Sequence, residues 1–355
     1  MSGGVDSTMA AYLLKKQGYE VHGVTMKIYG GEKRKKVVKN ACYGPGEAQD
    51  IAAAAKAARM LGITHEVIDL RAEYKKIVLD YFKKEYISGR TPNPCIVCNE
   101  KIKFGWLFKK SFSKSKRLGL FATGHYVRIK FDRTLKQFVL LKGLDKIKDQ
   151  SYFLYRLSPS QLGHILTPLG SWQKQVLKKF ASRHGFAEFA KKPESQDFYD
   201  CHGQQELLSG GLEGNIVNLK GEIIGKHQGI VNYTVGQRKN LKIGGLKEPY
   251  YVLAIKARQN IIIAGPKNEV YSTQLVLSDL NWIVPLCSLS RAARNNLQVK
   301  VRSSAHAVGC TVELCKNNQA ILILKRPQFA VAPGQSAVFY SGQLVIGGGI
   351  ISKIY

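Results

Sequence analysis

The chain has 355 residues, with 54 Lys and Arg against 25 Asp and Glu, which gives a formal net charge of +29. This length predicts two or three domains with ample core, and the sequence has neither a signal peptide nor an apolar run as long as a membrane helix requires. The basic excess predicts a polyanionic partner, and the seven unevenly spaced cysteines do not suit a secreted disulfide framework, so we expect a cytosolic protein with no membrane partner.

A glycine-rich hexapeptide, SGGVDS, opens the chain, and a segment with apolar residues at helical spacing follows it up to Gly18. Adjacent glycines let backbone amides approach a phosphate, and the start of a helix favours negative charge. The carboxylate of Asp6 could hold Mg²⁺ against that phosphate. The hexapeptide resembles the pyrophosphatase loop of ATP-dependent adenylating enzymes. We therefore expect an ATP-binding loop made of Ser2, Gly3, Gly4, Val5, Asp6 and Ser7.

The position of this loop is unusual. In nucleotide-binding α/β folds such a loop follows a buried strand, because the crevice lies at the carboxyl ends of the parallel strands. Here only Met1 precedes it. Either translation begins further upstream, or the first, central strand is missing from the sheet, and we expect the upstream start.

Strand and helix patterns alternate along the first 200 residues. Apolar periodicity predicts strands at 20–28, 64–70 and 119–125, helices at 47–61, at 71–86 and from about 99, a hairpin over 126–147, and two helical stretches between 158 and 190. Beyond residue 200, short alternating runs separated by Gly and Asn-Asn turns indicate β structure. We predict a doubly wound, Rossmann-like α/β domain over 1–200, a small central β domain over 201–270 and a C-terminal β-barrel over 271–355.

A second centre of chemistry is the segment PNPCIVCNEKIKFG at 92–105. Its prolines disfavour regular helix, so we expect Cys95 and Cys98 on a loop, with a helix starting near Asn99. A helix start and nearby lysines would lower the pKa of a thiol, which favours a reactive thiolate. Three interpretations stay open: a sulfur-handling nucleophile, a pair of metal or iron–sulfur ligands, and two inert thiols.

Seven segments together carry a resemblance to a known family: SGGVDS, TPNPCIVCNEKIKFG, ATGHYVR, KDQSYFLY, ESQDF, YTVGQRKNLKIGG and PGQSAVFY. In this order they resemble the tRNA-specific 2-thiouridylase family. The resemblance implies a pyrophosphatase-loop domain of the adenine nucleotide α-hydrolase type, a small central domain and a C-terminal β-barrel. It also implies conversion of the wobble uridine of tRNA to 2-thiouridine. In that reaction ATP adenylates the uridine C2 oxygen, and a cysteine persulfide then delivers sulfur and expels AMP.

The resemblance also implies roles for individual residues. Cys98 matches the cysteine that carries the sulfur, and Met26 and Gly124 match positions flanking the adenine. Asp6 would bind Mg²⁺ through pyrophosphate. Asn93, Pro94 and Cys95 match the stretch against the target base, and the tRNA-contacting positions are His125, Lys148, Asp149, Gln150, Arg302, Ser303 and Gln335. The implied partners are the anticodon loop of tRNA and an upstream sulfur donor, either a cysteine desulfurase or a relay protein.

Two departures from the family pattern leave the second cysteine open. Many members carry Asp where this chain has Cys95, and a second catalytic cysteine where it has Tyr199. The thiol that resolves the persulfide could be Cys201, Cys95 or Cys42. Alternatively, Cys42, Cys95 and Cys98 could hold an iron–sulfur cluster. Two rival functions are another pyrophosphatase-loop adenylating enzyme and a non-catalytic tRNA-binding relative.

Overall fold

The computed structural model describes residues 1–31, 42–113, 119–193, 198, 208, 211–245 and 248–355. The chain divides into two compact units. The first comprises Met1–Val78, Cys95–Gly203 and Gln343–Val345, and the second comprises Leu79–Pro94, Gln204–Gly342 and Ile346–Tyr355. Within the described ranges, no helix has both the length and the apolar character needed to span a lipid bilayer.

The first unit begins with the predicted alternation of helix and strand. Its elements are α1 (Val5–Lys16), β1 (His22–Lys27), α2 (Glu47–Leu61) and β2 (Thr64–Asp69). The two strands pair in parallel, from His22 opposite Thr64 to Lys27 opposite Asp69. Helix α2 ends where expected because Gly62 adopts a left-handed conformation, φ 59°, which glycine reaches at no steric cost.

A second parallel pair joins β3 (Phe121–Ala122) to β6 (Ile165–Leu166). The Rossmann-like class is therefore confirmed, but the described residues form two separate two-stranded parallel sheets rather than one continuous sheet. Along β1, the amino group of Met1 donates to Val24 O, and Thr25 Oγ1 donates to Met1 O at 2.7 Å. The strand expected before the loop stays a prediction.

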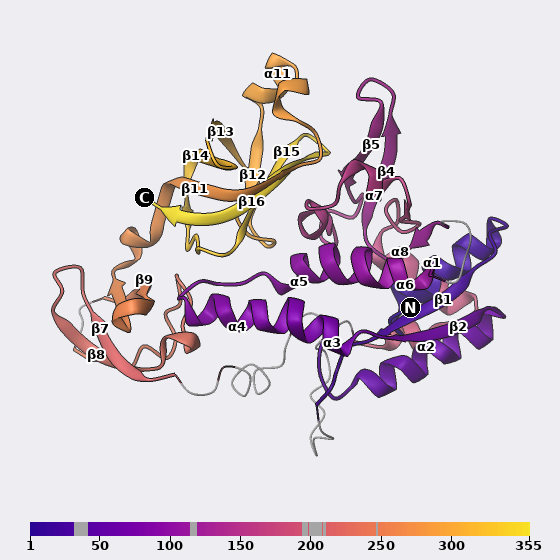
Figure 1. Ribbon diagram of the computed structural model, residues 1–355, viewed down its shortest axis with the longest axis horizontal. Coiled ribbons are helices and arrows are strands. Elements are labelled where there is room, and N and C mark those ends of the chain that lie inside the picture. The colour runs from indigo at the N-terminus through magenta and orange to yellow at the C-terminus, as the bar shows by residue number, and fades with distance from the viewer. Residues whose placement is uncertain (32–41, 114–118, 194–197, 199–207, 209–210, 246–247) are drawn as a thin grey trace. The chain divides into compact units, whose positions relative to one another are not determined.

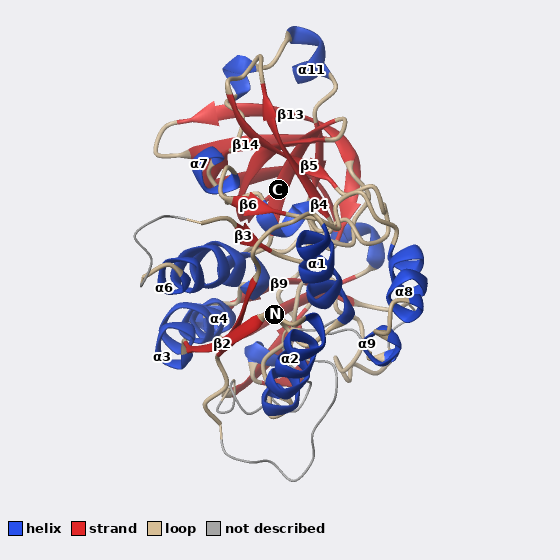
Figure 2. Cartoon of the chain, turned by 90° about the vertical axis from the view of Figure 1, so that its right-hand side faces the viewer, coloured by secondary structure: helices blue, strands red, loops and turns tan. Residues whose placement is uncertain are grey.

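The core of the first unit forms where α1 packs beside α2, α8 (Lys174–Arg183) and α9 (Ala187–Lys191), an arrangement visible in Figure 2. Met9, Ala57 and Leu177 are fully buried at this junction. The remaining elements that lie wholly or partly in this unit are α3 (Arg71–Tyr74), η1 (Lys75–Leu79), α5 (Pro94–Val97), η2 (Cys98–Leu107), α6 (Phe108–Ser111), β4 (Val127–Asp132), β5 (Gln137–Lys142), η3 (Ser151–Leu154) and α7 (Pro159–Leu162).

The second unit contains α4 (Asp80–Ile87) and two β assemblies. The smaller sheet has the order β8-β7-β10-β9, and the larger assembly is a closed ring of six strands, β11-β14-β13-β12-β15-β16, with β11 also paired to β16 (Figure 1). The ring confirms the predicted C-terminal barrel. The bounds are β7 (Glu213–Val217), β8 (Ile223–Gln228), η4 (Ile230–Asn232), β9 (Tyr251–Lys256), η5 (Ala257–Gln259), β10 (Ile261–Gly265), η6 (Lys267–Val270), β11 (Tyr271–Trp282), η7 (Leu286–Ser288), α11 (Arg291–Asn295), β12 (Gln298–Lys300), β13 (Val308–Cys315), β14 (Gln319–Phe329), β15 (Ser336–Ser341) and β16 (Leu344–Ile354).

Candidate functional site

The SGGVDS segment forms a tight loop that runs directly into α1. Gly3 has φ +68°, and a Cβ at this position would lie 2.4 Å from Asp50 O, so only glycine fits. The Ser7 hydroxyl donates to Gly4 O at 3.1 Å and accepts from the Ser2 amide at 3.1 Å. No side chain caps the start of α1. The N–H groups of its first turn are therefore the kind of donors that a phosphate takes at a helix N-terminus.

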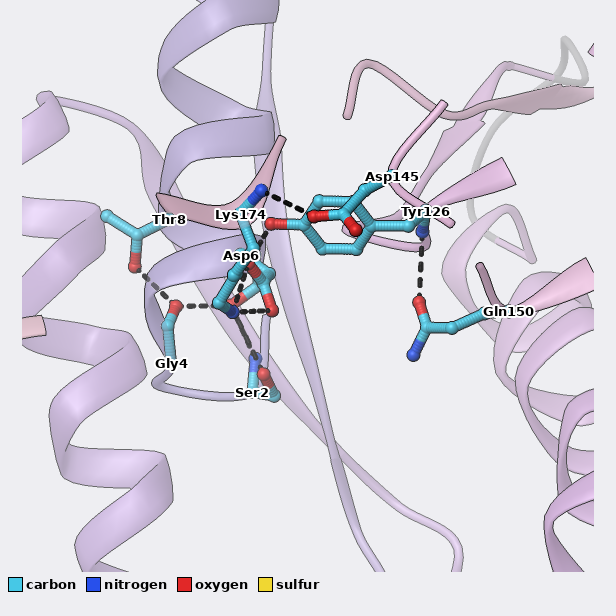
Figure 3. Close-up of polar contacts among 9 residues, drawn as sticks. Ser2, Gly4, Asp6, Thr8, Tyr126, Asp145, Gln150 and Lys174 are labelled. Atoms are coloured by element: carbon cyan, nitrogen blue, oxygen red, sulfur yellow. Dashed lines mark hydrogen bonds and ion pairs between the residues drawn. The ribbon is translucent and has the colours of Figure 1, made fainter. Parts of the chain in front are cut away.

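The carboxylate of Asp6 has two strong partners, and Figure 3 shows both side chains directed at it. Tyr126 Oη donates to Oδ1 at 2.8 Å, and Lys174 Nζ donates to both carboxylate oxygens at 2.7 Å. The side chain of Lys174 is 6% exposed and that of Asp6 is 33% exposed. A Cβ at position 124 would lie 2.8 Å from the Asp6 carbonyl carbon, so Gly124 lets the two segments approach closely. The structure thus places Gly124 beside the loop, and its expected position beside the adenine stays a prediction.

Sequence reasoning missed Lys174, although a signal existed. Residues 174, 177 and 181 share one helical face, and this face carries Leu177 and Ala181, which are fully buried. A lysine on the apolar face of a helix must find a partner inside the protein. The backbone N–H of Lys174 also donates to Asp145 Oδ2 at 2.9 Å, which fixes the start of α8 (Figure 3).

A second lysine that the sequence did not single out also contacts the loop. Lys192 Nζ donates to Gly3 O at 3.1 Å and to Asp50 Oδ1 at 2.6 Å. The predicted adenine-flanking residue Met26 is half-buried on β1, opposite Ile68. Two lysines therefore hold the loop from α8 and from the end of α9.

The two cysteines of the PNPCIVC segment lie in helical structure, which corrects the expectation of a loop. Helix α5 starts at Pro94, because proline is well suited to the first helical position, where its missing N–H needs no partner. Cys95 is half-buried in α5, and Cys98 is the first residue of η2, with 8% exposure.

The expected lowering of a thiol pKa is also wrong for Cys98. Burial raises the pKa of this thiol to about 11, because desolvation disfavours the thiolate. The positive charge of Lys103 acts in the opposite direction but is the smaller effect. The helix start cannot compensate either, since the helix begins at Pro94, four residues before Cys98, rather than near Asn99.

Three thiols influence the buried phenol of Tyr74 electrostatically. Burial raises the pKa of Tyr74 well above its usual range, and the charges of Cys98, Cys42 and Cys95 act in the same direction. Cys42 is exposed, and its neighbour Tyr43 stacks on Tyr74 with ring centroids 5.3 Å apart.

Among the described residues, no group of three His, Cys, Asp or Glu side chains could hold a metal ion. These thiols therefore do not fit an iron–sulfur cluster there, while Cys201 and Tyr199 lie outside the described residues.

The predicted tRNA-contacting residues of the first unit make bonds within the protein. His125 shares a hydrogen bond of 2.9 Å with Thr123 Oγ1, and burial lowers the pKa of its imidazole to about 3, which keeps the ring neutral at physiological pH. Asp149 Oδ1 accepts from the Gly143 and Ser151 amides, and Gln150 Oε1 accepts from the Tyr126 amide at 2.9 Å. The Lys148 amide donates to Asp145. These contacts shape the loop beside Tyr126, and RNA contact by the segment stays a prediction.

In the second unit, Arg302 and Ser303 are exposed in the turn that follows β12. Gln335, by contrast, faces the segment that precedes Cys95. Its Nε2 donates to Thr91 O at 3.2 Å and to Pro92 O at 3.0 Å. The predicted target-base residues come next in the chain: Asn93 is 9% exposed and its N–H donates to Tyr81 Oη at 3.2 Å, while Pro94 is buried.

Family models match most of the chain in three parts. Residues 1–201 match a tRNA methyl transferase HUP domain, residues 205–266 a tRNA methyl transferase PRC-barrel domain, and residues 272–351 an aminomethyltransferase beta-barrel domain. A solved structure of a predicted subunit of tRNA methyltransferase from Methanocaldococcus jannaschii is 19% identical and covers 51% of this chain and 71% of its own, with a TM-score of 0.31. That likeness is too weak to support any conclusion.

Several relatives carry the name tRNA-specific 2-thiouridylase MnmA. The protein of Endomicrobium trichonymphae is 42% identical over 356 residues, that of Acetivibrio thermocellus 40% over 359, and that of Orientia tsutsugamushi 39% over 360. Each alignment covers 99% of this chain, and it covers 97%, 97% and 94% of these relatives, respectively. With such identity sustained from end to end, the chain belongs to the tRNA-specific 2-thiouridylase family.

Proposed function

We propose that this protein catalyses the ATP-dependent 2-thiolation of the wobble uridine of tRNA in the cytoplasm. The observation that carries the proposal is the sequence identity of 42%, over 99% of the chain, to a named 2-thiouridylase. Family membership implies the use of ATP. The uncapped start of α1 and the held carboxylate of Asp6 give the SGGVDS loop the donors and the charge that this use requires.

The first chemical step is activation of the uridine. Its C2 oxygen attacks the α-phosphorus of ATP, the bond from that phosphorus to the bridging oxygen breaks, and pyrophosphate leaves with the bond electrons. The amides of the α1 first turn bind the departing phosphates. Mg²⁺, when bound, neutralises the pyrophosphate, and Asp6 is the residue that would hold it. The product is a uridine with AMP on its C2 oxygen, which makes that oxygen a leaving group.

The second step transfers sulfur. The terminal sulfur of a Cys98 persulfide attacks C2, and AMP departs with the former C2 oxygen. A second thiolate then attacks Cys98 Sγ, which releases 2-thiouridine and leaves a disulfide that an external thiol reduces. Cys201, Cys95 and Cys42 remain the candidates for the second thiol. The persulfide is loaded by an upstream donor, either a cysteine desulfurase or a relay protein.

The tRNA must present its uridine outside the anticodon stack to reach these groups. Asn93, Pro94 and Cys95 are proposed to lie against the extruded base. His125, Lys148, Asp149, Gln150, Arg302, Ser303 and Gln335 are proposed to lie along the bound tRNA. Of these, Arg302 offers an exposed guanidinium, the group best suited to a phosphate.

Replacement of Asp6 tests the ATP step. Asp6→Ala should abolish the formation of AMP in the presence of tRNA and ATP, because Mg²⁺ and Lys174 both lose their carboxylate partner. Binding of tRNA, measured by filter retention, should stay within about threefold of wild type, since Asp6 is a single charge among many. The matched control is Asp80→Ala, which removes an exposed carboxylate in the first turn of α4. Wild-type AMP formation by Asp6→Ala would refute the assignment of the loop.

A further inference from the structure

Lys174 stands out because its charge is buried. It is 4% exposed, and among the described residues it is the only Lys, Arg, Asp or Glu that is buried. Taking an ammonium out of water is expensive, and a buried ion pair often contributes no more stability than well-packed apolar side chains would. Fold stability alone therefore gives little reason for a lysine on the face of α8 that also carries Leu177 and Ala181.

The partner of Lys174 points to the reason. Its ammonium lies 2.7 Å from both oxygens of Asp6, the acidic residue of the loop and of the first turn of α1. An uncompensated carboxylate at this position would repel a polyphosphate, by about 1–4 kcal/mol for unit charges about 4 Å apart near a surface. The amides of the loop attract an anion while Asp6 repels it. Lys174 cancels that repulsion from the buried side.

The geometry also fixes the carboxylate. Tyr126 Oη and the Lys174 ammonium both donate to the carboxylate of Asp6 and hold it in place (Figure 3). Gly124 packs closely against the Asp6 backbone. The second oxygen, Oδ2, accepts only from Lys174 among the described residues. It therefore keeps a lone pair for a further ligand.

We propose that Lys174 is a positioning residue of the ATP site that acts through Asp6. Its ammonium keeps Asp6 charge-neutral towards the incoming polyphosphate and holds the carboxylate in one orientation. This inference rests on the proposed function in one respect, namely that ATP binds at the SGGVDS loop. Nothing in the sequence pattern of the loop identifies the residue, because 168 positions separate the two partners.

The test measures ATP affinity without Mg²⁺, where Asp6 can only repel the ligand. Isothermal titration of the full chain with ATP in excess EDTA compares wild type, Lys174→Met, Asp6→Asn/Lys174→Met and the control Lys179→Met. Lys179 is an exposed lysine on the same helix, so its loss changes the net charge equally. Thermal melts and a titration with Mg²⁺ present accompany each variant.

Lys174→Met should weaken ATP binding by at least about tenfold, because one uncompensated negative charge then faces the phosphates. Asp6→Asn/Lys174→Met should return to within about threefold of wild type, since the pair is neutral again. Lys179→Met should match wild type. A purely structural pair would lower the melting temperature of Lys174→Met and leave its ATP affinity unchanged, which would overturn the proposal.

A direct contact between Lys174 and phosphate would leave the double variant as weak as Lys174→Met, and this result would also overturn action through Asp6. If Lys174→Met fails to fold, Lys174→Gln takes its place in the same comparison, because its amide can still donate to Asp6. Failure of the proposed function looks different. In that case wild type itself binds no ATP even with Mg²⁺. A wrong assignment of Lys174, by contrast, leaves ATP binding by wild type intact and changes only the order of ATP affinities among the variants.

Discussion

The Cys98 thiol is held in its protonated form by its surroundings. The side chain is 8% exposed, and desolvation raises the pKa of the thiol to about 11 from an ordinary value of 9.0. Because the folded state binds this proton more tightly than the unfolded state, the thiol contributes stability below pH 9 that is lost as the pH rises from 9 towards 11. Burial and the raised pKa of this thiol therefore predict slow reaction of Cys98 with solutes in the free protein.

Alkylation kinetics test this protection. At neutral pH, iodoacetamide should modify Cys98 far more slowly than the exposed Cys287, and the Cys98 rate should continue to rise towards pH 11. Peptide mass spectrometry of timed samples separates the two sites. Equal rates at neutral pH, or a Cys98 rate that reaches its plateau below pH 9, would contradict a buried, protonated thiol.

Substitution of the same residue tests its chemical role. Cys98→Ser should abolish thiolation of tRNA, because a hydroxyl carries no persulfide, while tRNA affinity stays within a few-fold of wild type. The control Cys287→Ser removes an exposed thiol and should keep full activity. Thiolation by Cys98→Ser at the wild-type rate would remove Cys98 from the mechanism.

At the scale of elements, the turn between β14 and β15 is bonded to the segment that leads into α5. The Thr91 N–H donates to Pro333 O at 2.7 Å, and Gln335 Nε2 donates to the carbonyls of Thr91 and Pro92. Gly334 has φ +92°, and a Cβ there would lie 2.7 Å from Thr91 O, so a side chain would push the two segments apart. The turn therefore fixes the residues immediately before Asn93 and Pro94.

Gln335→Met keeps the bulk of the side chain and removes both donors. Hydrogen exchange at the Thr91 amide should accelerate in the free protein, and the thiolation rate at saturating tRNA should fall about tenfold. The affinity for tRNA should fall only a few-fold, because Gln335 is one of seven residues proposed to lie along the bound tRNA. Gln319→Met, at an exposed position of β14, is the matched control. Unchanged exchange at Thr91 together with an unchanged thiolation rate would show that Gln335 does not fix this segment.

The sequence predicted correctly those elements whose start and end depend on residues within the same segment. Helix α2 was predicted residue for residue, because its apolar periodicity and the left-handed Gly62 lie within one segment. The helical start at Pro94 was missed, because a proline excluded from a helix interior is favoured at its first position. The Asp6–Lys174 pair and the Gln335 contacts join residues 168 and more than 240 positions apart, and no local pattern encodes such pairings.

The charge of the whole molecule makes a prediction about binding. With a formal net charge of +29, affinity for tRNA should fall steeply with salt, because Lys and Arg release counterions when they neutralise phosphates. Arg302→Ala should reduce the slope of log Kd against log salt concentration by about 1 if its exposed guanidinium meets a phosphate. Titrations across a salt series measure both. An affinity independent of salt would mean that the basic excess serves another purpose.

The central claim is that this chain builds 2-thiouridine at the wobble position of tRNA. The most direct measurement is mass spectrometry of tRNA nucleosides from a strain that lacks its own 2-thiouridylase and expresses this chain, Asp6→Ala or Cys98→Ser. The wild-type chain should restore 2-thiouridine, and neither variant should, because one lacks the ATP-loop carboxylate and the other the sulfur carrier. Tandem fragmentation places the sulfur at the wobble nucleotide. Absence of 2-thiouridine in cells that contain the folded wild-type chain and its sulfur donor, or its formation by either variant at the wild-type level, would contradict the account.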